Sequence, residues 1–299
     1  MPPARHPERA GRAGRVLTRL SALGLLLVLF AAGGAASAGR PPQRIVALAP
    51  SAAEILFALG AGERVVAVPD FASDLPGAAG KVSIGGFVPD LERVVALSPD
   101  LVVASRDGTD RAAYEKLKAL GIPILATEAQ SLDGVLLDIR RVGEAIGEAG
   151  AAERLVTALL ERIAAAEKRA AGRKGPRPRV LVVIWPDPPV VAGPATFVGD
   201  LLVRARLENV VPGKAGEWPR VSHETLAGWN PDVVIRPETA ENAAAFTRTF
   251  AKDGRWQLVG AVRDGRVVSV PGVLLERPGP RLVDALERLA ALPAAGERP

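Results

Sequence analysis

One segment of the chain occurs twice, and this repeat constrains the fold more than any other feature of the sequence. Residues 91–103 and 223–235 align without a gap. The two copies share a glutamate, a proline and an aspartate in one register: Glu92, Pro99 and Asp100 in the first copy, and Glu224, Pro231 and Asp232 in the second. The shared glutamate stands 48 positions after Arg44 in the first half and 45 positions after Arg179 in the second, and each arginine opens a β-branched run. The repeat therefore predicts two similar lobes.

Short β-branched runs alternate with helix-forming stretches in the first half. We expect strands at 44–48, 65–68, 81–84, 101–104 and 122–125, and helices at 51–59, 91–97 and 110–120. Ser51 and Glu54 have the spacing of a capping box, and Gly60 is expected to end the first helix. Alternation of this kind is typical of a parallel, doubly wound sheet, so the predicted fold class is α/β.

A long helical stretch separates the two halves. Residues 132–171 are helix formers, interrupted only around 147–150, and the second part keeps apolar side chains on one face. About 22 helical residues span ~33 Å, enough to cross a small domain. Residues 151–171 contain no glycine or proline that could act as a hinge, so closure of the lobes is expected to be small. We expect two doubly wound α/β lobes, 39–148 and 176–299, joined by a single rigid helix at 149–175, with a ligand cleft between them.

The first 38 residues resemble a Sec-type signal peptide. Five arginines precede an apolar run at 23–32, and a small-residue tail ends at Ala38. Cleavage after Ala38 would export the rest of the chain to the periplasm. A retained membrane anchor is the alternative, because residues 20–38 approach spanning length.

Composition excludes several classes of function. The sequence has 299 residues, of which 48% are hydrophobic, and it contains no cysteine, so no disulfide, thiolate metal site, cysteine nucleophile or lipid-bearing cysteine is available. The first 38 residues carry five arginines against one glutamate, which leaves 33 basic and 32 acidic residues elsewhere. No nucleic-acid partner is expected, because the folded part lacks an excess of positive charge.

No pattern in the sequence indicates catalysis. A nucleophile elbow, a phosphate loop, a dinucleotide fingerprint and a cluster of metal ligands are all missing, and Gly85-Gly86 lacks the third glycine and the helix start that phosphate binding needs. His223 is the one histidine after the first 38 residues, and we expect it on the surface in a first helical turn. The sequence predicts a binding protein without a catalytic residue, a metal site or a cofactor.

Three stretches carry a resemblance to a known family. They are residues 44–51 with Glu54, residues 82–100, and residues 218–224. Over about residues 44–290 the chain resembles the periplasmic binding proteins of ABC importers that carry cobalamin, siderophores and haem, and it looks most like the cobalamin-binding members. The resemblance implies a monomer that delivers a metal-chelate ligand to a permease dimer with its ATPase.

Glu92 and Glu224 are the permease-docking residues that the resemblance implies. In the family, one glutamate on top of each lobe docks onto arginines of the two permease subunits. From the residues alone, each glutamate follows an N-cap, Asp90 or Ser222, in the first turn of a short helix. Interaction with the helix dipole, worth about 0.3 to 1 kcal/mol, explains such a carboxylate equally well.

Four aromatic residues near strand ends are candidate ligand contacts, because a planar macrocycle stacks on such rings. They are Phe71, Phe87, Trp185 and Trp218, whereas Trp229 and Trp256 are assigned mostly to structure. Arg277 matches a ligand-facing arginine of the cobalamin binders. Elsewhere in the cleft the sequence departs from the best-known cobalamin binder, with Ser105, Val273 and Phe71 at the positions of a tryptophan, an aspartate and a tyrosine.

Cobalamin is the expected ligand, and the alternatives come from the same family and beyond it. Siderophore carriers add arginines or tyrosines to bind an anionic chelate, and haem carriers use a tyrosine or histidine ligand, but Tyr114 and His223 fall on predicted helices. A periplasmic sensor would bind the same ligand without delivering it. A two-lobed transferase would need an acidic metal motif or a basic phosphate-binding cluster, and neither is evident.

Overall fold

The computed structural model describes residues 40–106, 108–238, 250 and 253–293. The chain divides into two compact units, Met1–Pro41 and Pro42–Pro299, and the second contains both lobes. The predicted signal peptide lies outside the described residues.

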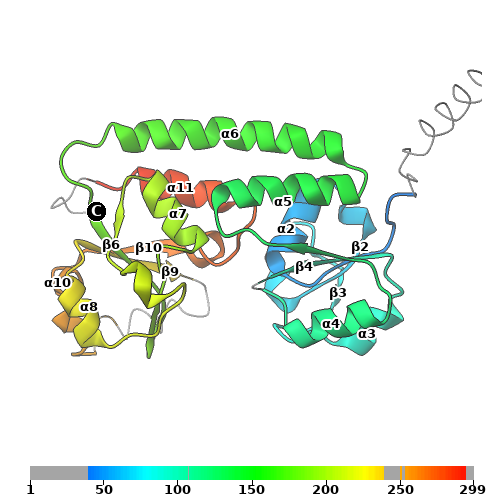
Figure 1. Ribbon diagram of the computed structural model, residues 1–299, viewed down its shortest axis with the longest axis horizontal. Helices are drawn as coiled ribbons and strands as arrows, with labels where there is room; N and C mark the ends of the chain where they lie inside the picture. The colour runs from blue at the N-terminus through cyan, green and yellow to red at the C-terminus, as the bar shows by residue number, and fades with distance from the viewer. Residues whose placement is uncertain (1–39, 107, 239–249, 251–252, 294–299) are drawn as a thin grey trace, which may run out of the picture. The chain divides into compact units, whose positions relative to one another are not determined.

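The first lobe contains a five-stranded sheet in which every neighbouring pair of strands is parallel, in the order β3-β2-β1-β4-β5 (Figure 1). The strands are β1 (Ile45–Ala47), β2 (Val65–Val68), β3 (Val82–Ser83), β4 (Leu101–Ser105) and β5 (Ile124–Thr127). The helices are α2 (Pro50–Ala58), α3 (Leu91–Ala96) and α4 (Arg111–Ala119), with 3-10 turns η1 (Gly62–Arg64) and η2 (Asp70–Ala72). The predicted doubly wound sheet is confirmed.

Alternate residues of β1 face opposite sides of this sheet, as the pleat requires. Ile45 and Ala47 pack in a cluster with α2, whereas Val46 packs with Val94 of α3 and Leu117 of α4. Both faces of the sheet are therefore covered, which explains why the strands are apolar throughout.

The predicted capping box at the start of α2 is wrong. Ala49 is the N-cap, no side chain caps the helix, and Pro50 occupies its first turn. Proline supplies no N–H there and has a backbone angle suited to a first helical position, so the helix begins before Ser51. The Glu54 side chain is buried and accepts hydrogen bonds from Arg281 instead.

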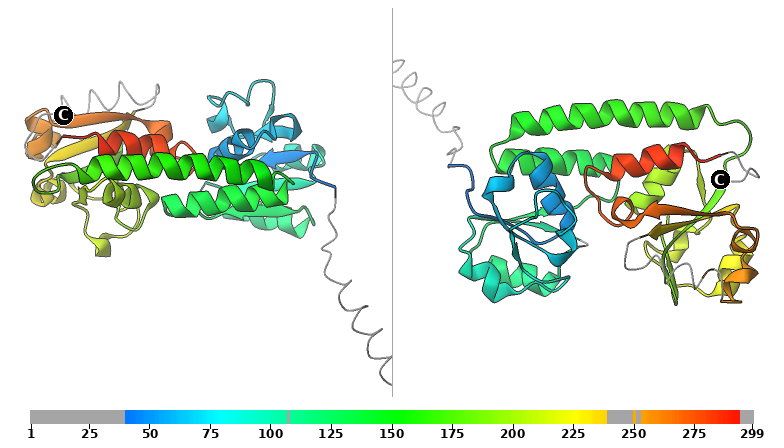
Figure 2. Two further views of the ribbon diagram at one scale, coloured as in Figure 1. Left: turned by 90° about the horizontal axis from the view of Figure 1, so that it is seen from above. Right: turned by 180° about the vertical axis from the view of Figure 1, so that it is seen from behind.

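The long helical stretch forms two helices, α5 (Leu132–Ala145) and α6 (Ala149–Ala171). The two helices are separate because Gly147 between them has a φ of 74°, which is incompatible with a right-handed α-helix. Both views in Figure 2 place α6 alongside α5 and α11 (Leu282–Ala290), with which it makes extensive contact. Arg162 on α6 forms ion pairs with Asp284 and Glu287 on α11 at 2.5 and 2.7 Å.

The second lobe has a mixed sheet in the order β10-β9-β6-β7, with β8 also pairing with β6. Its strands are β6 (Arg179–Pro186), β7 (Pro189–Val191), β8 (Glu208–Asn209), β9 (Val233–Glu238) and β10 (Val267–Pro271). Its other helices are α7 (Phe197–Arg204), α8 (His223–Trp229) and α10 (Gly260–Arg263), with 3-10 turns η3 (Gly213–Ala215), η4 (Trp256–Leu258) and η5 (Gly272–Leu274). Among the paired strands of the described residues, β6 and β7 are antiparallel and the other pairs are parallel, so the β6–β7 hairpin distinguishes this lobe from the first.

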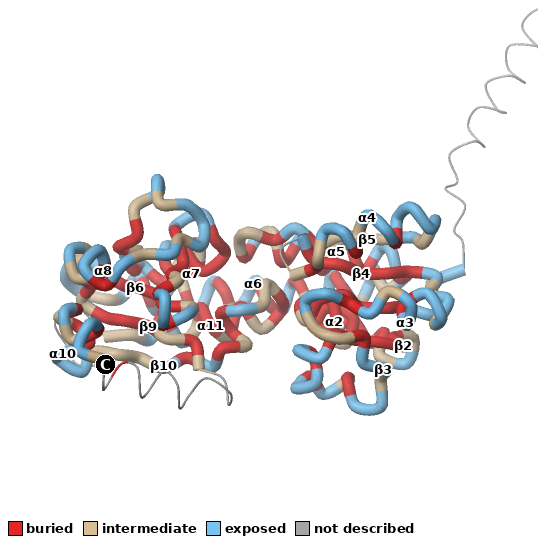
Figure 3. Tube along the Cα trace, turned by 90° about the horizontal axis from the view of Figure 1, so that it is seen from below, coloured by how far each residue is buried: buried red, intermediate tan, exposed pale blue. Residues whose placement is uncertain are grey.

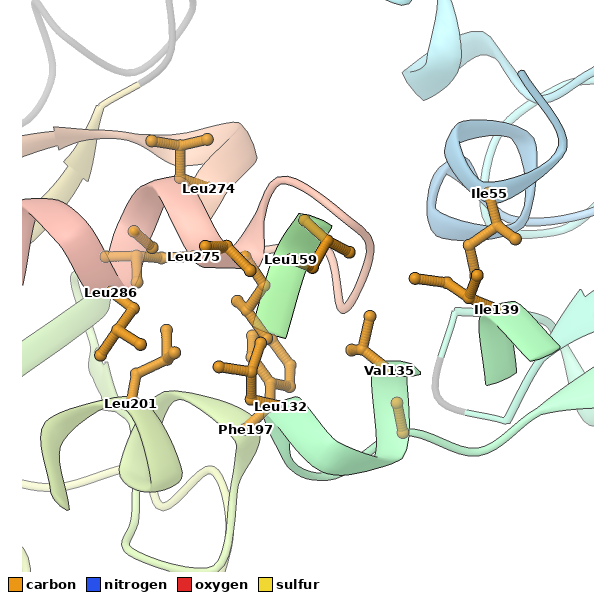
Figure 4. Packing of buried hydrophobic residues seen from close by; sticks show 14 of the residues in the cluster. Ile55, Leu132, Val135, Ile139, Leu159, Phe197, Leu201, Leu274, Leu275 and Leu286 are labelled. Carbon is orange, nitrogen blue, oxygen red and sulfur yellow. The ribbon is translucent and has the colours of Figure 1, made fainter. Parts of the chain in front are cut away.

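The largest apolar cluster runs through both lobes and α6 (Figures 3 and 4). Ile55 and Ile139 lie at one end of the labelled residues in Figure 4, and Leu201 and Leu286 lie at the other. Leu132 and Leu159, on α5 and α6, lie between them. The two lobes thus share this cluster, and each lobe also has a smaller apolar cluster of its own.

The repeated aspartates have the same role in both lobes. The Asp100 carboxylate accepts hydrogen bonds from the backbone N–H groups of Gln43 and Arg44 at 2.7 and 2.8 Å. Asp232 accepts one from the backbone N–H of Arg179 at 2.8 Å. Each aspartate therefore fixes the start of the leading strand of its lobe.

Backbone geometry follows the repeat as well. Ser98 and Asn230, at equivalent positions, have φ values of 46° and 47°. The residue before each of these two has a carbonyl oxygen that accepts a 2.8 Å hydrogen bond from an arginine side chain. Arg44 donates to Leu97, and Arg179 donates to Trp229. The sequence repeat is thus a structural repeat.

Candidate functional site

A cavity of about 680 Å³ lies between the lobes and is lined by residues of both. Residues that follow β1, β2 and β4 line it from the first lobe, and residues at the ends of β6, β9 and β10 line it from the second. The carboxyl ends of the strands are the usual ligand site of open α/β sheets, and the volume is typical of small-molecule pockets. The predicted cleft is therefore present.

Two of the four candidate aromatic residues line the cavity. Phe71, in η2, contributes a ring that is 56% exposed, and Trp218 contributes one that is 37% exposed. The Trp218 ring packs against Phe197 with centroids 5.7 Å apart. Phe197, which also lines the cavity, was not predicted, although an aromatic residue directly after a Thr N-cap, here Thr196, could have signalled it.

Phe87 and Trp185 are exposed but lie outside the cavity lining. Trp185 does not end its strand, because β6 continues into the hairpin where Trp185 pairs with Val190. Its indole N–H donates to the backbone carbonyl of Asp187 at 3.0 Å. Phe87 follows β3, the two-residue edge strand of its sheet.

Arg277 lines the cavity, but its guanidinium is already engaged. Nη1 donates to both carboxylate oxygens of Asp74 at 2.8 and 3.1 Å, and Nη2 donates to the carbonyl oxygen of Phe71 at 2.6 Å. Only 13% of the Arg277 side chain is exposed. The arginine therefore links segment 271–278 of the second lobe to η2 of the first, a role that the sequence did not indicate.

Glu54 adds a second link between the lobes. Its oxygens accept from the backbone N–H and from Nε of Arg281, at 2.8 and 3.1 Å. Burial raises the pKa of this carboxyl group, and the hydrogen bonds from Arg281 offset the rise only in part. The sequence held one indication of this contact: Glu54 stands between the apolar residues Ala53 and Ile55 in a helix.

Glu92 and Glu224 lie away from the cavity lining, exposed in the first turns of α3 and α8. The predicted N-caps are confirmed, since Asp90 accepts from the Arg93 N–H at 3.0 Å and Ser222 from the Thr225 N–H at 3.2 Å. The hydrogen bond with Ser222 lowers the pKa of Glu224. Each lobe thus presents one exposed glutamate carboxylate in the first turn of a short helix.

His223 is buried, contrary to the expected surface position. It is 5% exposed and meets Trp256 edge-on, with ring centroids 4.9 Å apart. The amphipathic turn of α8 directs its first residue into the lobe, and burial lowers the pKa of the imidazole. Trp256 is fully buried and stacks on Phe250, which confirms its structural assignment.

Two searches of the described residues gave negative results. No three His, Cys, Asp or Glu side chains come together there in a way that could hold a metal ion. None of the described helices combines the length and hydropathy of a membrane span.

Comparisons with known proteins place the chain in a family. The periplasmic binding protein family matches residues 45–274. An uncharacterized ABC transporter substrate-binding lipoprotein of Bacillus subtilis is 32% identical over 84% of this chain and 80% of its own length. A vitamin B12-binding protein of Pectobacterium carotovorum is 30% identical over 84% of this chain and 88% of its own.

Solved structures agree with the sequence comparisons. The apo periplasmic heme-binding protein RhuT from Roseiflexus sp. superposes with a TM-score of 0.74, is 29% identical, and covers 83% of this chain and 96% of its own. Two α/β lobes with a cavity between them fit the same group. The chain therefore belongs to the periplasmic binding protein family, as a non-enzymatic, substrate-binding component of ABC transport.

Proposed function

We propose that this protein captures a cobalamin-type corrinoid in the cavity between its lobes and delivers it to an ABC importer in the inner membrane. Its family membership already implies a small-molecule ligand and a permease with its ATPase as partners. The proposal adds the ligand, the location in the periplasm after removal of residues 1–38, and the surfaces used for delivery.

The aromatic wall of the cavity is the observation that carries the proposal. Phe71 from one lobe and Trp218 from the other lie on the lining, with Phe197 packed against Trp218. Apolar faces of a large planar macrocycle gain free energy by stacking on such rings. The vitamin B12-binding relative, at 30% identity over most of both chains, supports the same ligand.

Haem is the main rival, because a heme-binding protein is a structural neighbour. Haem iron is commonly held by a histidine or tyrosine side chain. No tyrosine or histidine occurs among the described residues that line the cavity. The Tyr114 side chain, on α4, packs against an apolar cluster of the first lobe, and the His223 side chain, on α8, is buried in the second. Neither residue lines the cavity. The lining therefore favours a ligand whose metal needs no ligand from the protein.

Delivery is proposed to use Glu92 and Glu224. Both carboxylates are exposed, both lie at equivalent positions of the two lobes, and neither has a role in the cavity. A permease dimer with two-fold symmetry needs matched contacts on the two lobes, and arginine–carboxylate pairs supply orientation as well as affinity.

Calorimetric titration of the purified protein with cyanocobalamin, haemin and ferrichrome tests the ligand. We expect saturable binding of cyanocobalamin with a stoichiometry of one, accompanied by quenching of tryptophan fluorescence from Trp218. Tight binding of haemin or ferrichrome without binding of cyanocobalamin would refute the corrinoid assignment and leave the family assignment intact.

A further inference from the structure

We propose that the cavity selects its ligand by charge, accepting neutral or positively charged metal chelates and rejecting anionic ones. The inference rests on the proposed function only for the identity of the preferred chelate, a corrinoid. Its basis is the sign and the exposure of the charged side chains that line the cavity.

The described lining residues include four carboxylates and one cation. The carboxylates are Asp70, Asp74, Glu238 and Glu276, and the cation is Arg277. Both lobes contribute, so a ligand between them meets carboxylates from two sides. A narrow cleft with low-dielectric walls concentrates such a potential.

Ion pairing does not cancel this negative charge at the cavity surface. In the Arg277–Asp74 pair, the Asp74 side chain is 39% exposed and the Arg277 side chain 13%. In the Arg236–Glu238 pair, the Glu238 side chain is 34% exposed and the Arg236 side chain 13%, with 3.3 Å between the charged atoms. In both pairs the acidic side chain is the more exposed partner, so it is the more accessible of the two to a ligand.

Asp70 is exposed, and its carboxylate accepts a hydrogen bond from a neutral group, the hydroxyl of Ser83. Near this edge, Arg281 is shared between the buried Glu54 and Asp74. Arg236, Arg277 and Arg281 are thus engaged with carboxylates, and an anionic ligand that bound one of these three arginines would have to displace such a contact.

The chemistry of the candidate ligands separates them on this basis. A cobalt(III) corrin carries a positively charged centre and amide side chains whose N–H groups can donate to carboxylates. A porphyrin with two propionates, or a tris-catecholate iron complex, would place negative charge against negative charge at a cost in affinity. Cobinamide, a corrinoid without the phosphate-bearing nucleotide loop, should therefore bind at least as tightly as cobalamin.

The test compares four probes on the purified protein: aquocyanocobinamide and ferrioxamine B with a charge of about +1, cyanocobalamin with a charge of about zero, and haemin with two propionates. Calorimetry is run on the wild type at low and high salt, on Asp70→Asn, and on Asp70→Asn combined with Glu238→Gln. Glu115→Gln combined with Glu144→Gln, two exposed carboxylates away from the cavity, is the matched control.

We expect the double variant to weaken cobinamide by about tenfold and to strengthen haemin, while the control changes neither. High salt should shift the wild type in the same direction, which tests the inference without any substitution. Haemin affinity equal to that of cobinamide, or an affinity ratio unchanged by both the variants and salt, would overturn the inference.

The outcome separates this inference from the proposed function. If no corrinoid binds but the cationic chelate ferrioxamine B does, and its affinity falls in the double variant, charge selection stands and the corrinoid assignment fails. If both corrinoids bind without any effect of charge, the corrinoid assignment stands and charge selection fails.

Discussion

The two lobes are alike where they begin their strands and unlike where they meet the ligand. Asp100 and Asp232 bind the first residues of β1 and β6, and Ser98 and Asn230 share a left-handed backbone conformation. At the cavity the first lobe contributes the 3-10 turn η2 with Phe71. The second contributes Trp218 and the segment 271–278.

This difference teaches which parts of a duplicated fold serve which purpose. The repeated positions set the frame of each lobe and the orientation of α3 and α8. The cavity walls come from connections that are free to differ, so the pocket is asymmetric although the frame is not. Functions that need symmetry, such as contact with a dimeric partner, should map to the repeat, and functions that need specificity should map outside it.

The largest expected effect comes from reversing charge at the repeated glutamates. Replacing both Glu92 and Glu224 with Lys should reduce uptake into vesicles that carry the cognate permease by more than about tenfold, because two attractive contacts become repulsive. Each single change to Ala should have a smaller effect of similar size in the two lobes.

Calorimetry and thermal unfolding provide the controls for that experiment. Ligand affinity and melting temperature should stay close to wild type, because both carboxylates are exposed and lie away from the cavity. Normal uptake by the double Lys variant would show that the two glutamates serve only their helices.

Substitutions in the cavity wall should lower the affinity for the ligand, which the substitutions at Glu92 and Glu224 leave unchanged. Trp218→Ala and Phe71→Ala should each weaken ligand binding by about 1 to 3 kcal/mol, through loss of stacking. Trp218→Ala is expected to cost more, since Trp218 also supports Phe197. Phe87→Ala, an exposed aromatic outside the lining, is the matched control in the same titration. If Trp218→Ala and Phe71→Ala bind the ligand as tightly as the Phe87→Ala control, the two rings do not contact the ligand.

The repeated aspartates should matter for stability to a similar degree. Asp100→Ala and Asp232→Ala should each lower the free energy of unfolding by about 1 to 2 kcal/mol, because backbone N–H groups lose a charged acceptor. Asp100 makes two such bonds but is more exposed, whereas Asp232 is partly buried. Urea titration monitored by circular dichroism measures both. If only one of the two variants has a lower free energy of unfolding, the two aspartates do not contribute equally to stability.

The smallest expected effect is at the one repeated position where a buried histidine replaces a leucine. His223 aligns with Leu91, and no described residue offers a hydrogen-bond partner to its buried Nε2 atom. His223→Leu should raise the free energy of unfolding by about 1 kcal/mol, because a buried unpaired nitrogen is removed.

That gain should depend on pH. Burial lowers the pKa of His223, so below about pH 6.5 the unfolded chain takes up a proton that the folded chain does not, and the wild type loses stability as pH falls. The difference between variant and wild type should therefore be larger at pH 5 than at pH 8. Urea unfolding at the two pH values measures it, and a decrease toward low pH would contradict the assignment.

Local pattern was enough to predict most of the fold. The strand and helix alternation, the break near Gly147 and the N-caps Asp90 and Ser222 all depend on residues close in sequence, and all are confirmed. The capping box failed because Glu54 has a stronger interaction with a residue 227 positions away, Arg281. Sequence spacing carries no information on a partner that distant.

The cavity was predictable only in outline for the same reason. Phe71 and Trp218 could be placed near strand ends, but the continuation of β6 into a hairpin, which moves Trp185 out of the lining, depends on pairing with β7. The engagement of Arg277 by Asp74 depends on how the two lobes meet. Those contacts are tertiary, and local propensities do not encode them.

The apolar cluster shared by the two lobes has a consequence for how this molecule melts. Ile55 and Ile139 in the first lobe, Leu159 on α6 and Leu286 on α11 all belong to it. Exposing the core of either lobe would open the same cluster, so neither half is expected to survive as a separately folded species. Heat should therefore unfold residues 42–293 in one cooperative transition, with equal calorimetric and van't Hoff enthalpies, even though the ligand cavity is lined by two separate lobes.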